Sequence, residues 1–164
     1  MAREARERLI DEARLRELSD RAEISDVQLR YATGVDTRDW ALLRTCFTDV
    51  LEVDFSSGFG FPVVRAPADE WVDAVAPVMG ALQATHHMIT NQVITFDDDD
   101  RATCVAYVQA GHHNPNDTGE SELMVYGFYT NRFERTADGW RIATCKLTVS
   151  WMTGNLGLFG DASD

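Results

Sequence analysis

The first third of the chain carries apolar residues at the spacing of helical faces. A loose apolar stripe among Arg and Glu before residue 18 predicts one helix, and Ser19 with Asp20 offers the cap of a second helix. Core-type residues then recur at steps of three and four, which predicts a helix with one buried face: Ile24, Val27, Gln28, Tyr31 and Ala32. Gly34 is placed to end this helix, and residues 41–47 predict a third, short one.

From Val50 onward the pattern changes to the alternation expected of strands, and residues 51–55 predict the first strand. An amphipathic helix follows over Pro67–Leu82, which Pro77 is expected to kink or interrupt. Four long runs then predict strands over Thr85–Phe96, Ala102–His113, Glu122–Arg135 and Trp140–Trp151. Two of the connectors between them are tight and rich in Asp or Gly, so neighbouring strands are expected to form antiparallel hairpins.

Helices followed by long antiparallel strands are typical of the α+β class, in which the helices lie across one face of the sheet. We therefore expect a curved antiparallel sheet that forms a cone, with the N-terminal helices closing a pocket. A length of 164 residues corresponds to a single domain over 1–164. Residues 154–164 are rich in glycine and are expected to form a loop or tail.

Composition narrows the possible partners. The chain has 15 basic and 27 acidic residues and a net charge of −12, so nucleic acid is a poor partner. The three cysteines form no zinc motif, and their odd number does not suit a disulfide framework. The N-terminal residues lack the apolar run of a signal peptide, and no stretch reaches the ~18 apolar residues of a membrane span. We therefore expect a cytoplasmic protein that binds neither nucleic acid nor membrane.

Strand alternation sorts side chains by face, because successive residues point to opposite sides of a sheet. In the strand over Ala102–His113, one face is small and apolar, includes Val108 and Ala110, and ends in His112. Such a face is typical of the wall of an apolar cavity with one polar group.

The strand over Thr85–Phe96 offers one histidine on each face. His87 shares its face with Ile89 and Asn91, whereas His86 shares the other face with Met88, and periodicity does not choose between them. Neighbouring histidines point to opposite sides, so neither 86 with 87 nor 112 with 113 easily ligates one metal ion. The acidic turn over 97–100 lacks the Gly and Glu of a calcium loop and is expected to be a solvated hairpin turn.

Two short sequences, VDTRDW over 35–40 and ATHHMITN over 84–91, carry a resemblance to a known family. The chain resembles the SnoaL-like branch of the nuclear-transport-factor-2-like superfamily, and within it scytalone dehydratase and the bile acid dehydratases, over about Leu18–Trp151. The resemblance implies that Asp36 and His87 are the catalytic Asp and His. It also implies an active-site role for His112 or its neighbour at 113, with His112 favoured by its apolar face, and for Tyr31 by residue type.

The sequence departs from scytalone dehydratase at several positions, so scytalone itself is not the expected substrate. Phe55 stands in the place of a tyrosine that binds water, and Gly127 and Tyr129 stand in the places of Ser and Asn. The residues that we expect to contact the substrate come from the strands and their aromatic side chains: Phe55, Asn91, Val108, Ala110, Tyr129 and Trp151.

An Asp–His pair at the end of an apolar cone is suited to acid–base catalysis. Asp36 would orient the imidazole of His87, which would take a proton α to a carbonyl before a β-hydroxyl leaves as water. His112 and Tyr31 would polarise the carbonyl or protonate the leaving group. The expected protein is thus a dehydratase without a cofactor, acting on a small hydrophobic compound of the polycyclic or polyketide-like carbonyl class.

Several other functions fit the same sequence. An isomerase or a polyketide cyclase would use the same abstracted proton. An iron site built from His87, His112 and Asp36 would lack the usual H-x-D spacing. A protein that only binds an apolar ligand, or the small subunit of an oxygenase, would not need contact between Asp36 and His87. Asp36 could also simply cap the short helix that contains Trp40.

The resemblance further implies a homo-oligomer, a trimer or else a dimer. The aromatic-rich strands over residues 123–133 and 140–151 suit such a contact on the outer surface of the sheet.

Overall fold

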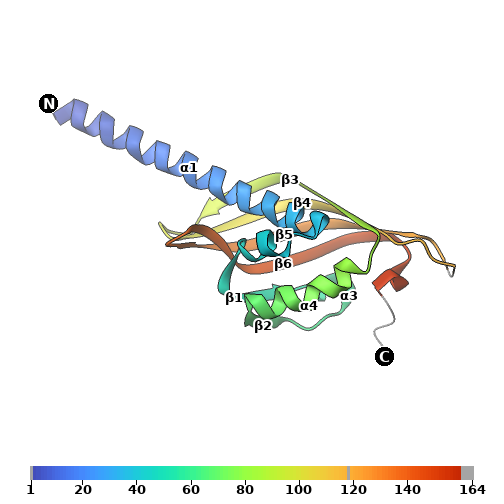
Figure 1. The fold of residues 1–164 in the computed structure, drawn as a ribbon. Helices are drawn as coiled ribbons and strands as arrows, with labels where there is room; N and C mark the ends of the chain where they lie inside the picture. The colour runs from blue at the N-terminus through green and yellow to red at the C-terminus, as the bar shows by residue number, and fades with distance from the viewer. Residues whose placement is uncertain (1, 118, 160–164) are drawn as a thin grey trace.

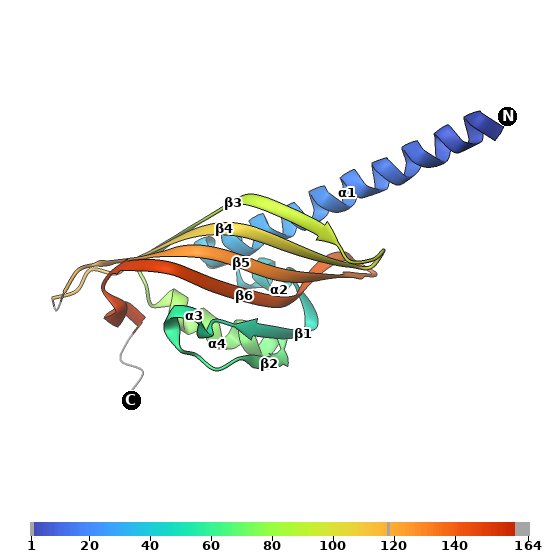
Figure 2. The same cartoon turned by 180° about the vertical axis from the view of Figure 1, so that it is seen from behind.

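The computed structural model describes residues 2–117 and 119–159, and within them the predicted α+β architecture is confirmed. A long helix, α1 (Ala2–Thr37), crosses one face of the sheet with its C-terminal half (Figure 1). In both views the N-terminal part of α1 extends beyond the sheet (Figure 2). None of the helices in these residues combines the length and the hydropathy that crossing a membrane requires.

The predicted break in this helix at Ser19 and Asp20 is wrong, because α1 is continuous. Asp20 does not cap a helix but is buried against the sheet. Its carboxylate accepts hydrogen bonds from Arg135 at 2.8 and 2.7 Å and from the indole Nε1 of Trp140 at 3.0 Å. A capping residue and a buried ion-pair partner look alike in a sequence, and here tertiary contact decides the role.

Gly34 does not end α1, as predicted, but lies inside it. A Cβ atom on Gly34 would lie 2.9 Å from the backbone nitrogen of Leu43, so glycine permits α2 (Trp40–Arg44) to pack closely on α1. The helix ends at Thr37, where Arg38 adopts the left-handed conformation with φ 61°. The N-cap of α2 is Asp39, whose side chain accepts from the amide of Leu42 at 2.8 Å.

The described residues form one six-stranded sheet in the order β2-β1-β6-β5-β4-β3. The strands are β1 (Phe47–Asp54), β2 (Val64–Pro67), β3 (Ala84–Phe96), β4 (Arg101–His113), β5 (Glu122–Thr136) and β6 (Gly139–Gly154). The four predicted long strands correspond to β3–β6 and pair antiparallel. The prediction of a purely antiparallel sheet needs one correction, since β1 runs parallel to β6 and β2 was not predicted. The sheet is curved but open, with β2 and β3 at its edges.

A bulge in β3 changes which residues face inward. Between Thr90 and Val93, β3 has one more residue than the facing stretch of β4, and Asn91 adopts a φ of 52°. Before the bulge, His87 and Ile89 are on the inward face of the strand. After the bulge, Ile94 and Phe96 pack against the core, and Val93 is 63% exposed.

The remaining elements pack near β1, β2, β5 and β6. They are the short kinked helix α3 (Ser56–Phe59), α4 (Ala68–Gly80), which continues past Pro77, and the 3-10 helix η1 (Leu156–Phe159). The predicted loop or tail over 154–164 therefore contains a helical turn, and residues 160–164 lie outside the described part of the chain. The large buried side chains of the core lie where α1, α2 and the sheet meet: Ile24, Leu43, Phe47, Phe133, Trp140 and Ile142.

Candidate active site

A cavity of about 450 Å³ lies inside the curved sheet, between α1, α4 and the segment after β1. Pockets for small molecules have volumes of roughly 300–1,000 Å³ and mostly apolar walls. The apolar side chains of this wall include Val35, Val53, Phe55, Phe59, Trp71, Val75, Met79, Ala110, Val125, Leu147 and Phe159. Its polar side chains come from two histidines and two tyrosines, namely His87, His112, Tyr31 and Tyr129.

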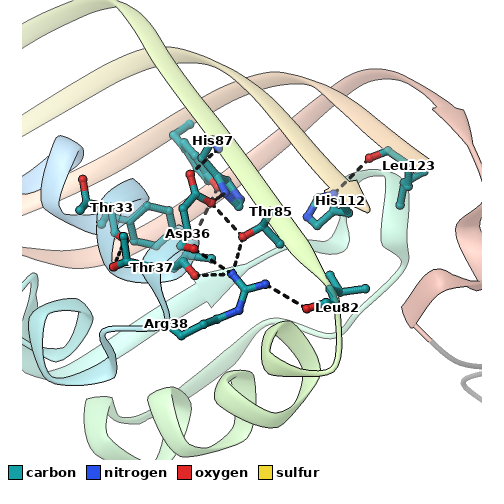
Figure 3. A network of polar contacts seen from close by, with 12 residues as sticks. Thr33, Asp36, Thr37, Arg38, Leu82, Thr85, His87, His112 and Leu123 are labelled. Carbon is teal, nitrogen blue, oxygen red and sulfur yellow. Dashed lines mark hydrogen bonds and ion pairs between the residues drawn. The ribbon is translucent and has the colours of Figure 1, made fainter. Parts of the chain in front are cut away.

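The predicted contact between Asp36 and His87 is present. The ring Nδ1 of His87 lies 2.7 Å from Oδ1 of Asp36, and the backbone amide of His87 donates to Oδ2, also at 2.7 Å (Figure 3). The side chain of His87 is only 6% exposed and that of Asp36 19%. Asp36 comes from the last turn of α1 and His87 from β3, so the contact joins the helix to the sheet. Asp36 therefore does not cap α2.

The surroundings of Asp36 favour an ionised carboxylate. Burial alone would raise the pKa of Asp36, but hydrogen bonds from the ring and the backbone of His87, together with one from Thr85, lower that pKa below its usual value. An ionised Asp36 can only accept at Oδ1, so Nδ1 of His87 carries a hydrogen, and in the neutral imidazole the lone pair is then on Nε2. Nε2 is therefore the basic atom that His87 offers to the cavity.

His112, the favoured member of its pair, is 5% exposed and lines the cavity, with its ring centroid 5.7 Å from that of His87. Burial, followed by the neighbouring His87, lowers the pKa of His112 to about 4. Its Nδ1 lies 3.3 Å from the carbonyl oxygen of Leu123, which can only accept a hydrogen bond. At neutral pH His112 thus carries its hydrogen on Nδ1. His113 faces away, 3.7 Å from Glu122.

Two tyrosines supply the hydroxyl groups of the cavity. The hydroxyl oxygens of Tyr31, from α1, and Tyr129, from β5, lie 3.3 Å apart, and both side chains line the cavity. Burial raises the pKa of Tyr31 and of Tyr129 well above the usual value, so both hydroxyls keep their hydrogens. One hydrogen is used between the two oxygens, which leaves the other for an acceptor in the cavity.

Of the residues predicted to contact substrate, Phe55, Ala110 and Tyr129 line the cavity. Val108 is 2% exposed and lies on the same face of β4, but it is packed in the core and does not line the cavity.

Two further residues of this set lie away from the cavity, Asn91 and Trp151. Asn91 is exposed because it sits in the bulge of β3, where strict alternation fails. Trp151 is 57% exposed and stacks on Tyr126 with ring centroids 4.7 Å apart, on the side of the sheet that faces away from the cavity.

The sequence did not indicate several cavity residues, because their positions depend on tertiary structure. Phe59, Trp71 and Met79 reach the cavity from α3 and α4. Phe159 reaches it from η1, and its ring centroid lies 4.9 Å from that of His112. Among residues 2–117 and 119–159, no group of three His, Cys, Asp or Glu side chains is arranged to hold a metal ion.

Comparison with known proteins identifies the family of this chain. The SnoaL-like domain matches residues 16–146. A dehydratase of Pestalotiopsis microspora, GME11372, is 25% identical over 139 residues, covering 80% of this chain and 87% of the relative. A scytalone dehydratase-like protein of Claviceps purpurea (strain 20.1) is 23% identical over 128 residues, covering 74% of this chain and 81% of the relative.

Among solved structures, the Kfla4162 protein of Kribbella flavida superposes with a TM-score of 0.82 and 41% identity, covering 87% of this chain and 98% of that protein. The family match spans α1 from residue 16, both histidine-bearing strands and the first half of β6. The chain therefore belongs to the SnoaL-like domain family, within the nuclear-transport-factor-2-like superfamily.

Proposed function

We propose that this protein is a lyase of the dehydratase type that removes water from a small, hydrophobic β-hydroxy carbonyl compound without a cofactor. The contact of Asp36 with His87 at the wall of an apolar cavity is the observation that carries this proposal. A protein that only binds apolar ligands has no need of an imidazole oriented by a carboxylate. The names of two relatives, a dehydratase and a scytalone dehydratase-like protein, support the same reaction class.

His87 is the base of the proposed reaction. Nε2 takes a proton from the carbon α to the carbonyl, and the electrons of that C–H bond form the new C=C bond as the β C–O bond breaks. Asp36 stabilises the imidazolium that forms, as a carboxylate does at Nδ1 of a catalytic histidine. The proton taken by His87 then passes to the departing hydroxide and gives water, so the histidine ends as it began.

The tyrosine pair provides the hydrogen for the substrate carbonyl. One hydroxyl of Tyr31 and Tyr129 remains free to donate to an oxygen on which negative charge develops during proton abstraction. His112 takes a different part from those predicted. Its hydrogen is committed to the carbonyl of Leu123, and its low pKa leaves Nε2 unprotonated at neutral pH, so it accepts a hydrogen bond from a substrate hydroxyl rather than protonating the leaving group.

The apolar wall defines the class of substrate. The aromatic side chains Phe55, Phe59 and Trp71, together with Phe159, provide flat surfaces for rings. No Arg or Lys lines the cavity within the described residues, so an uncharged cyclic ketone or polyketide-like compound suits it better than a carboxylate or phosphate.

A panel of cyclic β-hydroxy ketones tests this proposal. We expect ultraviolet absorbance of an enone to appear, together with the loss of one water by mass. His87→Ala and Asp36→Asn should each lower kcat by at least about 100-fold, since general base catalysis contributes roughly 10²–10⁴-fold. His86→Ala is the matched control, because this exposed neighbour lies on the same strand and points away from the cavity.

The same assay separates the competing reactions. Migration of a double bond without loss of mass would identify an isomerase, and ring closure without loss of water would identify a cyclase. Full activity of His87→Ala, with its fold intact by circular dichroism, would contradict the assigned base.

A further inference from the structure

A chain of hydrogen bonds leads from Arg38 through Thr85 to the Asp36 carboxylate. Nη1 of Arg38 donates to Oγ1 of Thr85 at 2.7 Å, and Oγ1 of Thr85 donates to Oδ1 of Asp36 at 2.9 Å (Figure 3). Thr85 is buried on β3, two residues before His87 and on the same face of the strand. The mechanism described above uses neither Arg38 nor Thr85.

Arg38 joins the end of α1 to the segment that enters β3. Its guanidinium donates to two carbonyl oxygens of the last helical turn, those of Val35 at 2.8 Å and Asp36 at 3.2 Å. It also donates to the carbonyl oxygen of Leu82 at 3.2 Å, just before the strand. The residue holds a φ of 61°, a conformation that non-glycine residues adopt rarely and at some cost. An arginine thus stands where glycine would fit more easily, and its guanidinium makes four hydrogen bonds there.

The direction of the hydrogen bonds in this chain is fixed by chemistry. A guanidinium has only hydrogens to offer, so Thr85 must accept from Arg38. The single hydroxyl hydrogen of Thr85 is then free for Asp36, which accepts it as a carboxylate. Arg38 thereby selects the rotamer of the Thr85 hydroxyl that donates to Oδ1.

Asp36 consequently has three donors around one carboxylate. Oδ1 accepts from the ring of His87 and from Thr85, and Oδ2 accepts from the backbone amide of His87. The two contacts with His87 fix the distance of the pair, and the contact with Thr85 opposes rotation of the carboxylate about its last bond. Misplacing a catalytic group by 1 Å can cost about 100-fold in rate.

We propose that Arg38 and Thr85 are positioning residues that act in series to hold the Asp36 carboxylate against Nδ1 of His87. The proposal rests on the function assigned to that pair above. It predicts that Thr85 acts directly on the Asp36 carboxylate and that Arg38 acts on this carboxylate through Thr85, whereas its bonds to the three carbonyl oxygens hold the backbone on either side. Neither residue lines the cavity, so kcat should change and KM should not.

Thr85→Val removes the hydroxyl with little change of shape. We expect kcat to fall about 10- to 100-fold with KM nearly unchanged. The acid limb of the kcat/KM profile should move to higher pH, because the Asp36–His87 pair holds a proton more strongly once the carboxylate has lost a donor. Thr85→Ser keeps the hydroxyl and should restore most of the rate.

Thr37→Val is the matched control for Thr85→Val. Thr37 is an exposed threonine at the same end of α1, and its hydroxyl donates to the carbonyl of Thr33 at 2.7 Å. This substitution should leave both kcat and the pH profile unchanged.

Arg38→Gly tests the order of the chain, because glycine accepts the left-handed backbone while the bonds from the guanidinium to Thr85 and to three carbonyl oxygens are lost. We expect a smaller loss of kcat than with Thr85→Val. In the Thr85→Val background, Arg38→Gly should lower kcat by a smaller factor than it does alone, since the hydroxyl through which Arg38 acts on the carboxylate is already absent. Additive losses in the double variant would overturn the serial arrangement.

A measurement without substrate separates this proposal from the proposed function. Nitrogen-15 NMR of labelled histidines reports the pH at which the Asp36–His87 pair takes up a proton. In Thr85→Val this pH should rise, in Thr37→Val it should not, and in Thr85→Ser it should return toward that of the unmodified protein. If the unmodified protein converts none of the ketones but the NMR shift appears, the proposed reaction fails and the positioning role stands. An unshifted titration in a folded Thr85→Val protein would overturn the positioning role.

Discussion

His112 combines a buried position with a strongly lowered pKa, which has a consequence for stability. Its pKa is about 4 in the folded protein and 6.5 in an ordinary environment. Between these values the unfolded chain binds a proton that the folded chain does not. The free energy of unfolding should therefore fall as the pH is lowered from 6.5 to 4, by about 3 kcal/mol from this residue.

Urea unfolding at several pH values measures this contribution. His112→Asn keeps a donor for the carbonyl of Leu123 but cannot titrate, so its unfolding free energy should lack this decline. His113→Asn serves as the control, because His113 is 41% exposed. The lowered pKa of Asp36 adds a loss of stability only near and below pH 3.8, outside this window. If the unfolding free energies of His112→Asn and of the unmodified protein fall equally between pH 6.5 and 4, the decline does not come from His112.

At the scale of single residues, the sequence predicts the Asp36–His87 contact better than the positions of the residues around it. Motif resemblance identified Asp36 and His87, and strand alternation favoured His112 over its neighbour. Alternation could not place Asn91, because a bulge adds a residue that no periodic pattern reveals. Thr85 stands beside the two histidines in ATHHMITN, yet only the fold shows that its hydroxyl reaches Asp36.

At the scale of elements, Gly34 shows how packing reverses an intrinsic preference. Alanine inside a helix is favoured over glycine by about 1 kcal/mol. At Gly34 the added Cβ would lie 2.9 Å from the backbone nitrogen of Leu43 and 3.0 Å from its Cα, and backbone atoms cannot rotate away. Such overpacking costs about 1–3 kcal/mol. We therefore expect Gly34→Ala to destabilise the protein by about 1 kcal/mol and to lower Tm by a few degrees.

Gly80→Ala is the matched control for this substitution. Gly80 is also helical, at the end of α4, but a Cβ there would meet no atom within 4 Å. Its Tm should stay the same or rise. A higher Tm for Gly34→Ala would show that α1 and α2 can move apart to accommodate the Cβ atom without loss of stability.

The ends of the four long strands were predicted to within three residues, because the strands alternate regularly and are joined by turns. The helices were less predictable. The loose stripe before residue 18 remains exposed in the structure, with Leu9, Leu15 and Leu18 about two-thirds exposed, so periodicity there does not report burial. The parallel pairing of β1 with β6 depends on a contact between distant parts of the chain, which local patterns do not encode.

At the scale of the whole molecule, the face of the sheet opposite the cavity carries several exposed apolar side chains. The strand register brings Met88, Gln109, Tyr126 and Trp151 into one row across four strands. A neighbouring row contains Tyr107 and Phe128. Met88, Tyr107 and Trp151 are each about half exposed. A large exposed apolar patch on a folded domain commonly marks an interface.

We propose that copies of this chain associate through that face, as a trimer in keeping with the family resemblance. The mass in solution, measured by light scattering, should then be three times the 18.4 kDa of one chain. Because each copy carries a net charge of −12, association should strengthen as salt screens the repulsion. Tyr107→Glu should weaken assembly, whereas Leu15→Glu, on the exposed part of α1, should not. A mass of two chains would indicate a dimer instead. A mass of one chain at all salt concentrations would contradict self-association through this face.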